Sequence, residues 1–289
     1  MPGSLLGGTG RGPKGAPVSG LQALSAIDWQ RPWFAPCAAL GRLAQQRVLA
    51  GAGVADALNA LVDAGLAPDP GVCFVPQAAL PPGMAYEQFI LERGAVPTRD
   101  NPHDFFNGLM WLHWPQAKRR MNRLHGAAVQ AQGAGAARGP LRDALTLLDE
   151  NGALLLAPPA LWQALAARQW RRLFVELRPL WGQARLLVLG HALLEKLLAP
   201  RKPITAHVWC APAAPGAGLA PPPDAWLAGA LDAAHLRGKP FVPLPVLGIP
   251  GWWPGNENFS FYDDSLVFRS ARLKETETTE PDRAAGAPS

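Results

Sequence analysis

Two segments of this chain place histidines and carboxylates at spacings that suit metal-assisted chemistry. In NPHDFFNGLMWLHWP, His103 and Asp104 are neighbours, and Asn107 follows His103 by one helical turn. In GHALLEKLL, His191 and Glu195 are four residues apart, so a helix would carry both on one face. An unpaired carboxylate is costly to bury, so Glu195 needs a cation, a proton or a metal ion. Imidazoles and carboxylates together suit Mn, Fe or Zn.

The first segment also has a structural explanation. Asn101 and Pro102 are the residue types of a helix N-cap and first helical position, and Asp104 in the first turn complements the helix dipole. Capping does not require His103 or Asn107, which share one face. They form either a hydrogen-bonded pair in the core or a pair that faces a substrate.

The second pair lies on a helix predicted over residues 183–199. Glu195 either bonds His191 inside the core, or the two groups bind a divalent ion or position a water molecule. His207 follows in PITAHVWC, whose alternation predicts a strand. A half-buried structural position and a place near the His191 pair both remain open for His207.

Further carboxylates occur in DALTLLDENGALLLAP, which predicts two short strands around a turn at residues 150–152. Asp149 and Glu150 are ordinary residues for such a turn and are also candidate catalytic carboxylates. Helices are predicted at 102–113 and 115–130. The fold class is therefore α+β, a mostly helical single domain with a small β-sheet or hairpin.

Composition suggests one domain with unstructured ends. Residues 20–270 are predicted to form a single globular domain, residues 1–19 a disordered leader and 271–289 a disordered tail. Residues 211–223 (APAAPGAGLAPPP) read as a low-complexity surface loop. The 48% hydrophobic content is enough for a large core, and the longest apolar run is too short and charged to span a membrane.

The absent motifs exclude several classes of function. The chain has no GxxxxGK phosphate loop, no strand-linked GxGxxG and no GxSxG elbow. Its three cysteines form no CxxC pair, which favours a reducing cytoplasm over a disulfide framework or a thiolate zinc site. The net charge of +5 is compatible with an anionic partner. Nucleic acid is one candidate, through Arg119, Arg120 and Arg123 beside Trp111 and Trp114.

Four segments in this order resemble the bacterial family catalogued as domain of unknown function 3025, for which no function is established. The resemblance covers roughly residues 20–270 and implies a cytosolic bacterial protein. It rests on TRDNPHDFFNGLMWLHWPQAKRRMNRLH, RDALTLLDENGALLLAP, GHALLEKLLAPRKPITAHV and PLPVLGIPGWWPGNENFSFYDDSLVFR. The polar residues that look out of place in apolar surroundings belong to this pattern.

Three functions follow as hypotheses. The first is a divalent-metal-dependent hydrolase acting on a phosphorylated or nucleotide-like substrate. The second is a metal-free binding module for an anionic ligand or nucleic acid, and the third is a structural protein with a buried polar network. For the hydrolase, the candidate metal ligands are His103, Asp104, His191 and Glu195, and the candidate catalytic residues are Asp149, Glu150, His207, Asn107 and Arg99.

Overall fold

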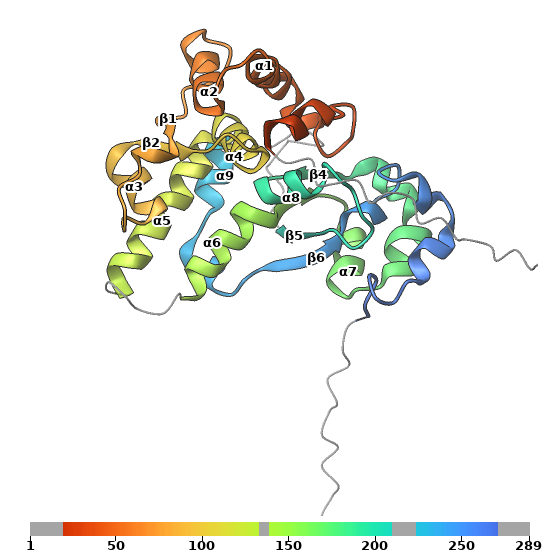
Figure 1. Cartoon of the computed structure of the whole chain (residues 1–289). Coiled ribbons are helices and arrows are strands. Elements are labelled where there is room, and N and C mark those ends of the chain that lie inside the picture. Colours follow the sequence, from red (N-terminus) through yellow and green to blue (C-terminus); the bar gives the residue numbers. More distant parts are fainter. Residues whose placement is uncertain (1–19, 133–138, 210–223, 271–289) are drawn as a thin grey trace, which may run out of the picture.

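In the computed structural model, helices make up most of the structure and a small mixed sheet lies among them (Figure 1). The structure describes residues 20–132, 139–209 and 224–270, so the expected leader, tail and loop 211–223 lie outside the described residues. The helices are α1 (Ala38–Leu49), α2 (Val54–Asp63), α3 (Tyr86–Arg93), α4 (Pro102–His113), α5 (Pro115–Gln132), α6 (Pro140–Asn151), α7 (Pro159–Ala166), α8 (His191–Lys196), α9 (Asp224–Ala230) and α10 (Ala233–Arg237). The predicted mostly helical α+β class is confirmed.

The strands form two sheets. They are β1 (Cys73–Pro76), β2 (Ala95–Thr98), β3 (Gly152–Leu156), β4 (Arg185–Val188), β5 (Thr205–Trp209) and β6 (Phe241–Pro245). Strands β1 and β2 pair in parallel, and the larger sheet has the order β4-β3-β5-β6. Strand β3 runs antiparallel to β4 and parallel to β5, and all its residues are buried. An uninterrupted apolar run is typical of a strand covered on both faces.

The predicted hairpin at 150–152 is wrong in its first half. Residues 140–151 form α6, and the chain passes from Asn151 directly into β3. The reason lies in the apolar spacing: Leu141, Leu145 and Leu148 are buried together with Ala144, which is helical periodicity rather than alternation. The second half of the prediction is confirmed as β3.

The predicted helix over 183–199 is also wrong in its first half, where residues 185–188 form β4 instead. The backbone amides of Leu189 and Gly190 both donate to the carbonyl oxygen of Gly152, at 3.0 and 2.9 Å. Helix α8 then starts at His191 and packs against both α4 and α6 (Figure 1). This junction brings the start of α8 beside the end of α6.

Helices α4 and α5 follow one another as predicted. The Asn101 side chain accepts from the Asp104 amide at 2.8 Å, which confirms the N-cap of α4. Helix α5 starts at Pro115, and Asp224 of α9 accepts from the first free amides of α5, those of Gln116 and Ala117. A carboxylate at that end of a helix satisfies free donors and complements the dipole.

The buried apolar residues form one continuous cluster that extends from Leu24 to Phe268. Trp33 and Trp209 are among its largest fully buried side chains. Within the described ranges, no helix combines the length and the hydropathy that crossing a membrane requires.

Gly190 sits where α8 approaches the end of α6, and this contact generates a prediction. A Cβ atom at Gly190 would lie 2.5 Å from the Glu150 carbonyl oxygen and 2.6 Å from the Asn151 amide nitrogen. Gly190→Ala is therefore expected to force α8 away from α6 and lower the free energy of unfolding by about 1–3 kcal/mol, the usual cost of overpacking. Urea denaturation followed by circular dichroism measures this.

Gly229 provides the matched control. A Cβ atom at this position in α9 meets nothing within 4 Å. Gly229→Ala is expected to leave stability unchanged or raise it, because alanine favours helices over glycine. If Gly190→Ala were as stable as Gly229→Ala, the close packing of α6 against α8 would not constrain the fold.

Candidate metal centre

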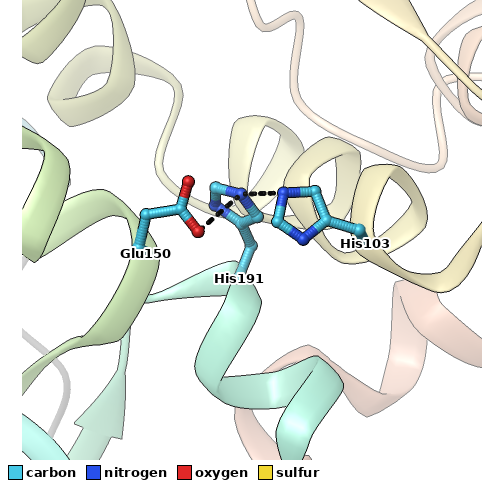
Figure 2. Close-up of side chains that lie close together, drawn as sticks. All are labelled: His103, Glu150 and His191. Carbon is cyan, nitrogen blue, oxygen red and sulfur yellow. Dashed lines mark hydrogen bonds and ion pairs between the residues drawn. The ribbon is translucent and has the colours of Figure 1, made fainter.

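Three side chains from three helices converge on one point. His103 is the second residue of α4, His191 the first of α8, and Glu150 the last but one of α6. The Nε2 atoms of His103 and His191 are 3.0 Å apart, and Oε2 of Glu150 is 3.6 Å from Nε2 of His191 (Figure 2). One possible ligand atom from each residue lies within 4.8 Å of the others. We call these residues the triad.

The spacing within the triad suits a shared ion. Two ligand atoms about 2.1 Å from one metal ion, at an angle of about 90–110°, are about 3.0–3.4 Å apart. The two imidazole nitrogens match this range, and the Glu150 oxygen is slightly beyond it from His191 and within 4.8 Å of His103. Figure 2 shows the ring nitrogens of the two histidines facing one another, with the Glu150 carboxylate on the far side of His191.

The surroundings of the two Nδ1 atoms, the outer ring nitrogens that point away from the facing Nε2 atoms, agree with this arrangement. Nδ1 of His103 lies 2.8 Å from Oε2 of Glu195, so it carries the proton and leaves a lone pair on Nε2. Without a metal, Nε2–H of His191 donates to that lone pair. Nδ1 of His191 is then an acceptor, and it is buried without a hydrogen bond, 3.8 Å from Asp149. A metal ion would take the place of the Nε2 proton and let Nδ1–H of His191 face Asp149.

Glu195 and Asp149 therefore stand behind the two histidines. A carboxylate that accepts from the outer nitrogen of a metal-bound histidine orients the ring and raises its basicity. Burial lowers the pKa of His191 to about 4, although the Asp149 carboxylate opposes the shift. Burial would raise the pKa of Asp149, but the charges of Lys118 and His191 lower it. His191 is thus neutral at pH 7 and Asp149 is ionised.

A buried network holds Asp149 in place. The Lys118 ammonium forms an ion pair with Asp149, donates to Oδ1 of Asn107 at 2.9 Å, and lies over the Trp111 ring. Asn107 donates to the Tyr86 hydroxyl at 2.9 Å. Asn107 is thus part of the network that leads to the triad, and Lys118 and Asp149 lie between it and His191.

Sequence reasoning missed Lys118 and Tyr86. Lys118 directly precedes the basic residues Arg119, Arg120 and Arg123, which suggests an exposed side chain, but its side chain is 6% exposed. The available signal was spacing: Met121 and His125 lie on the same face of α5 as Lys118, three and seven residues further along the chain. Tyr86 had no comparable local signal, because its partner Asn107 lies 21 positions away.

Two of the predicted ligands, Glu195 and Asp104, lie outside the triad. Glu150 takes the place in the triad expected for Glu195, and Glu195 bonds the outer side of His103. Asp104 instead binds Arg99, accepting from its backbone amide at 2.6 Å and from its guanidinium with both carboxylate oxygens at 3.0 Å. Asp104 therefore stabilises the turn that leads into α4.

The structure places His207 apart from the triad. It lies half-buried on β5, paired in register with Gly152 of β3. Burial and then the charge of Lys196 lower its pKa. The neighbouring strand thus brings His207 towards the end of α6, but the triad is completed by Glu150 instead.

The basic residues of α5 do not form the expected stacking surface. Trp111 and Trp114 are 2% and 6% exposed and therefore cannot stack on bases. Arg119 packs over Gly71, and Nε of Arg120 donates to the Leu231 carbonyl at 3.3 Å. Arg123 is exposed.

Comparison with known proteins places the chain in a family. The family described as "Protein of unknown function (DUF3025)" matches residues 72–272. The chain belongs to this family. The match includes the triad, the carboxylates behind it and the Lys118 network, and the family description assigns no activity. No curated protein and no solved structure matches the chain.

The buried imidazole of His191 predicts a pH-dependent stability in the metal-free protein. Its pKa is about 4 in the folded state against 6.5 as the ordinary value, so the unfolded chain binds the proton more tightly. This contribution to stability is complete above pH 6.5 and is lost as the pH falls from 6.5 to 4. It amounts to about 3 kcal/mol at most.

His191→Gln is therefore expected to flatten the dependence of unfolding free energy on pH between 4 and 6.5, whatever it does to stability at pH 8. Urea titrations at several pH values in the presence of a chelator measure the slope. An unchanged slope would mean that His191 is not buried in its neutral form.

Proposed function

We propose that the protein is a divalent-metal-dependent hydrolase of the bacterial cytoplasm, with the triad as its metal ligands. The observation that carries the proposal is the pair of Nε2 atoms 3.0 Å apart, with Glu150 beside them and Glu195 behind His103. A structural core pair would not need a third ligand group, nor a carboxylate fixing the outer nitrogen of His103.

The ligand set supports catalysis rather than a purely structural ion. Catalytic zinc sites typically have three protein ligands and keep a further position for water, whereas structural sites are closed by four. A divalent ion here would supply an activated water as the nucleophile. Two histidines with one carboxylate suit Zn, Fe or Mn.

Glu195 is the best candidate for the proton acceptor. Its side chain is 40% exposed, against 33% for Glu150 and 24% for Asp149, so solvent reaches it most easily. Only its Oε2 engages His103, at 2.8 Å. Asp149 is engaged by Lys118, and its lowered pKa makes it the weaker base.

Arg99 supports the hypothesis that the substrate is phosphorylated or nucleotide-like. The Arg99 side chain is 57% exposed. The hydrogen bond to Asp104 is the largest cause of the raised pKa of its guanidinium, and the charge of Glu195 adds a smaller contribution, so Arg99 is within electrostatic reach of Glu195. A guanidinium in that position is suited to a phosphate group. Arg99 also binds Asp104, through Nε and Nη2, but it is exposed. Lys118, in contrast, is 6% exposed and is engaged by Asp149 and Asn107.

Metal binding tests the ligand assignment. We expect the purified protein to bind one divalent ion, and His103→Ala and Glu150→Gln to lose most of the affinity. Glu195→Gln should lose about 10–100-fold, as for other residues that orient a ligand. Elemental analysis and calorimetric titration with Zn²⁺, Mn²⁺ and Fe²⁺ measure this.

His113→Gln is the control for the metal titration, because His113 lies at the other end of α4 and contacts Trp114. It should bind metal like the wild type. Equal metal affinity for His113→Gln and His103→Ala would show that the triad is not the metal-binding site.

The reaction class has its own test. The metal-loaded protein is expected to hydrolyse members of a panel of phosphate esters and nucleotides, and Glu195→Gln to lower kcat more than KM, since it removes the proton acceptor. Arg99→Met should instead raise KM. Oxygen consumption by an iron-loaded protein without hydrolysis would favour an oxygenase, because iron oxygenases use the same ligand types.

A further inference from the structure

A cavity separate from the triad lies among the end of α7, the strands β5 and β6, and the segment that ends at Arg269. Its volume is about 380 Å³, which is within the usual range for sites that bind small molecules. Helix α7 packs beside β6, and none of the described residues that line the cavity comes from α4, α6 or α8 (Figure 1). A ligand in this cavity would therefore not touch the triad.

Two arginines line this cavity, and its described lining residues include no carboxylate. Arg168 is half-buried, and its side chain makes no hydrogen bond or ion pair within the part of the chain that the structure describes. The Nε of Arg269 donates to the Leu266 carbonyl at 3.0 Å, and its two terminal nitrogens have no acceptor among the same residues. The cavity is therefore positively charged and contains guanidinium donors that are not in use.

The backbone of Arg168 has a conformation that favours glycine. Its φ is 52°, and it directly follows the last turn of α7. Its amide donates to the Leu165 carbonyl at 2.9 Å, in the type of helix ending where glycine is the commonest residue. Among the described residues one other non-glycine residue, Lys239, has a positive φ, and it is held by an ion pair with Asp143 at 3.2 Å. A strained conformation at a residue with unused donors is typical of a functional position.

One wall of the cavity is apolar. Thr205 of β5 pairs in register with Pro245 of β6, and residues paired in this way lie on the same face of the sheet. Pro243, two residues before Pro245, lies on that face too, and neither proline has an amide N–H to offer. Leu266, which also lines the cavity, is 78% exposed. A ligand with an apolar body would remove these surfaces from water.

The segment that carries Arg269 is held in place by Trp170. The Nε1 of Trp170 donates to the Arg269 carbonyl at 2.8 Å, and its ring packs edge-on against Phe268 with 6.0 Å between ring centres. Trp170 is 7% exposed, so these contacts tie the segment firmly to the chain that follows α7. Both guanidinium groups thus extend from fixed backbone positions, which lowers the entropy cost of binding a ligand.

We propose that this cavity is a second binding site, for a small organic anion in which a carboxylate or phosphate group is joined to an apolar body. The anionic group would bind the guanidinium groups of Arg168 and Arg269. The apolar body would lie against Pro243, Pro245 and Leu266. Because the site is separate from the triad, it does not depend on the proposed hydrolase activity.

Calorimetric titration with four small probes tests this proposal. Phenylphosphonate and benzoate carry both features, benzylammonium has the same ring with the opposite charge, and inorganic phosphate lacks the apolar body. Metal-free wild-type protein, kept in a chelator, is expected to bind the first two with a Kd of about 1 mM or lower. It should bind inorganic phosphate more weakly and benzylammonium not at all. Phenylphosphonate contains no ester bond, so hydrolysis at the triad cannot affect the titration.

Matched arginine variants locate the bound anion. Arg168→Met and Arg269→Met should each weaken phenylphosphonate binding about tenfold or more, since each removes charge-assisted hydrogen bonds. Arg171→Met is the control, because Arg171 is exposed, lies three residues after Arg168 and does not line the cavity. It removes the same charge and should keep the wild-type affinity. Arg99→Met, which removes a charge near the triad, should keep it too.

Arg168→Gly distinguishes a ligand-binding role from a structural one. Glycine adopts a φ of 52° without strain, so this variant is expected to unfold at a urea concentration equal to or above that of the wild type. It should lose phenylphosphonate binding to the same extent as Arg168→Met. A lower urea midpoint would show that the Arg168 side chain supports the fold, and would count against the proposal.

Several outcomes would overturn the inference and leave the hydrolase proposal standing. One is failure to bind either phenylphosphonate or benzoate, and another is equal binding of benzylammonium. Equal loss of affinity in Arg171→Met and Arg168→Met would show an effect of overall charge rather than a site. Binding that is lost in Arg99→Met and kept in Arg168→Met would place the anion near the triad instead. Anion binding by a protein that binds no divalent metal would support this site and contradict the metal centre.

Discussion

Two backbone amides, those of Leu189 and Gly190, donate to the single carbonyl oxygen of Gly152. This shared acceptor joins the end of β4 to the start of β3, so the two helices attached to those strands meet end to end. Helix α6 delivers Glu150 two residues before Gly152, and α8 delivers His191 directly after Gly190. The geometry of the triad therefore depends on a backbone contact rather than on side-chain attraction. Position 190 needs glycine because the backbone of Glu150 occupies the space of a Cβ atom.

The buried charges form the second level of this arrangement. Removing Lys118 and Asp149 from water carries a large desolvation cost, which their ion pair offsets only when the remaining polar atoms are also satisfied. Asn107 and the Trp111 ring complete the surroundings of the ammonium. Such a network is costly if any member is lost, and it is a poor choice if stability alone is required. The network lies beside His191, and it keeps Asp149 ionised 3.8 Å from the Nδ1 atom of that ring.

The start of α4 was predictable because capping is a local property: Asn101, Pro102 and Asp104 are neighbours in the chain and do what their types suggest. The hairpin prediction failed because a turn-like Glu-Asn-Gly was weighted above the helical spacing of Leu141, Leu145 and Leu148. The predicted helix over 183–199 failed because an apolar run reads the same for a buried strand and a buried helix. In each case the segment changes from one kind of element to another within a few residues.

Which residues lie together was more predictable than how they are arranged. His103, His191, Glu195, Asp149 and Glu150 were all singled out, yet the carboxylate beside the two imidazoles proved to be Glu150. Helix geometry places His191 and Glu195 on one face, but only the packing of α4 against α8 decides that Glu195 reaches the outer nitrogen of His103. Lys118 was missed because its partner Asp149 lies 31 positions away, in a segment that was predicted as a strand and is a helix.

The triad draws one group from each of three helices, and its two histidines are 88 positions apart in the chain. An ion held by all three would act as a cross-link between distant segments, comparable to a disulfide in its effect on the unfolded chain. Assembly of the centre would then be inseparable from closure of the fold, since no fragment containing α4 alone or α8 alone carries more than one of the ligands. The three cysteines contain no CxxC pair, so a bound metal ion would be the covalent-like cross-link that ties α4, α6 and α8 together.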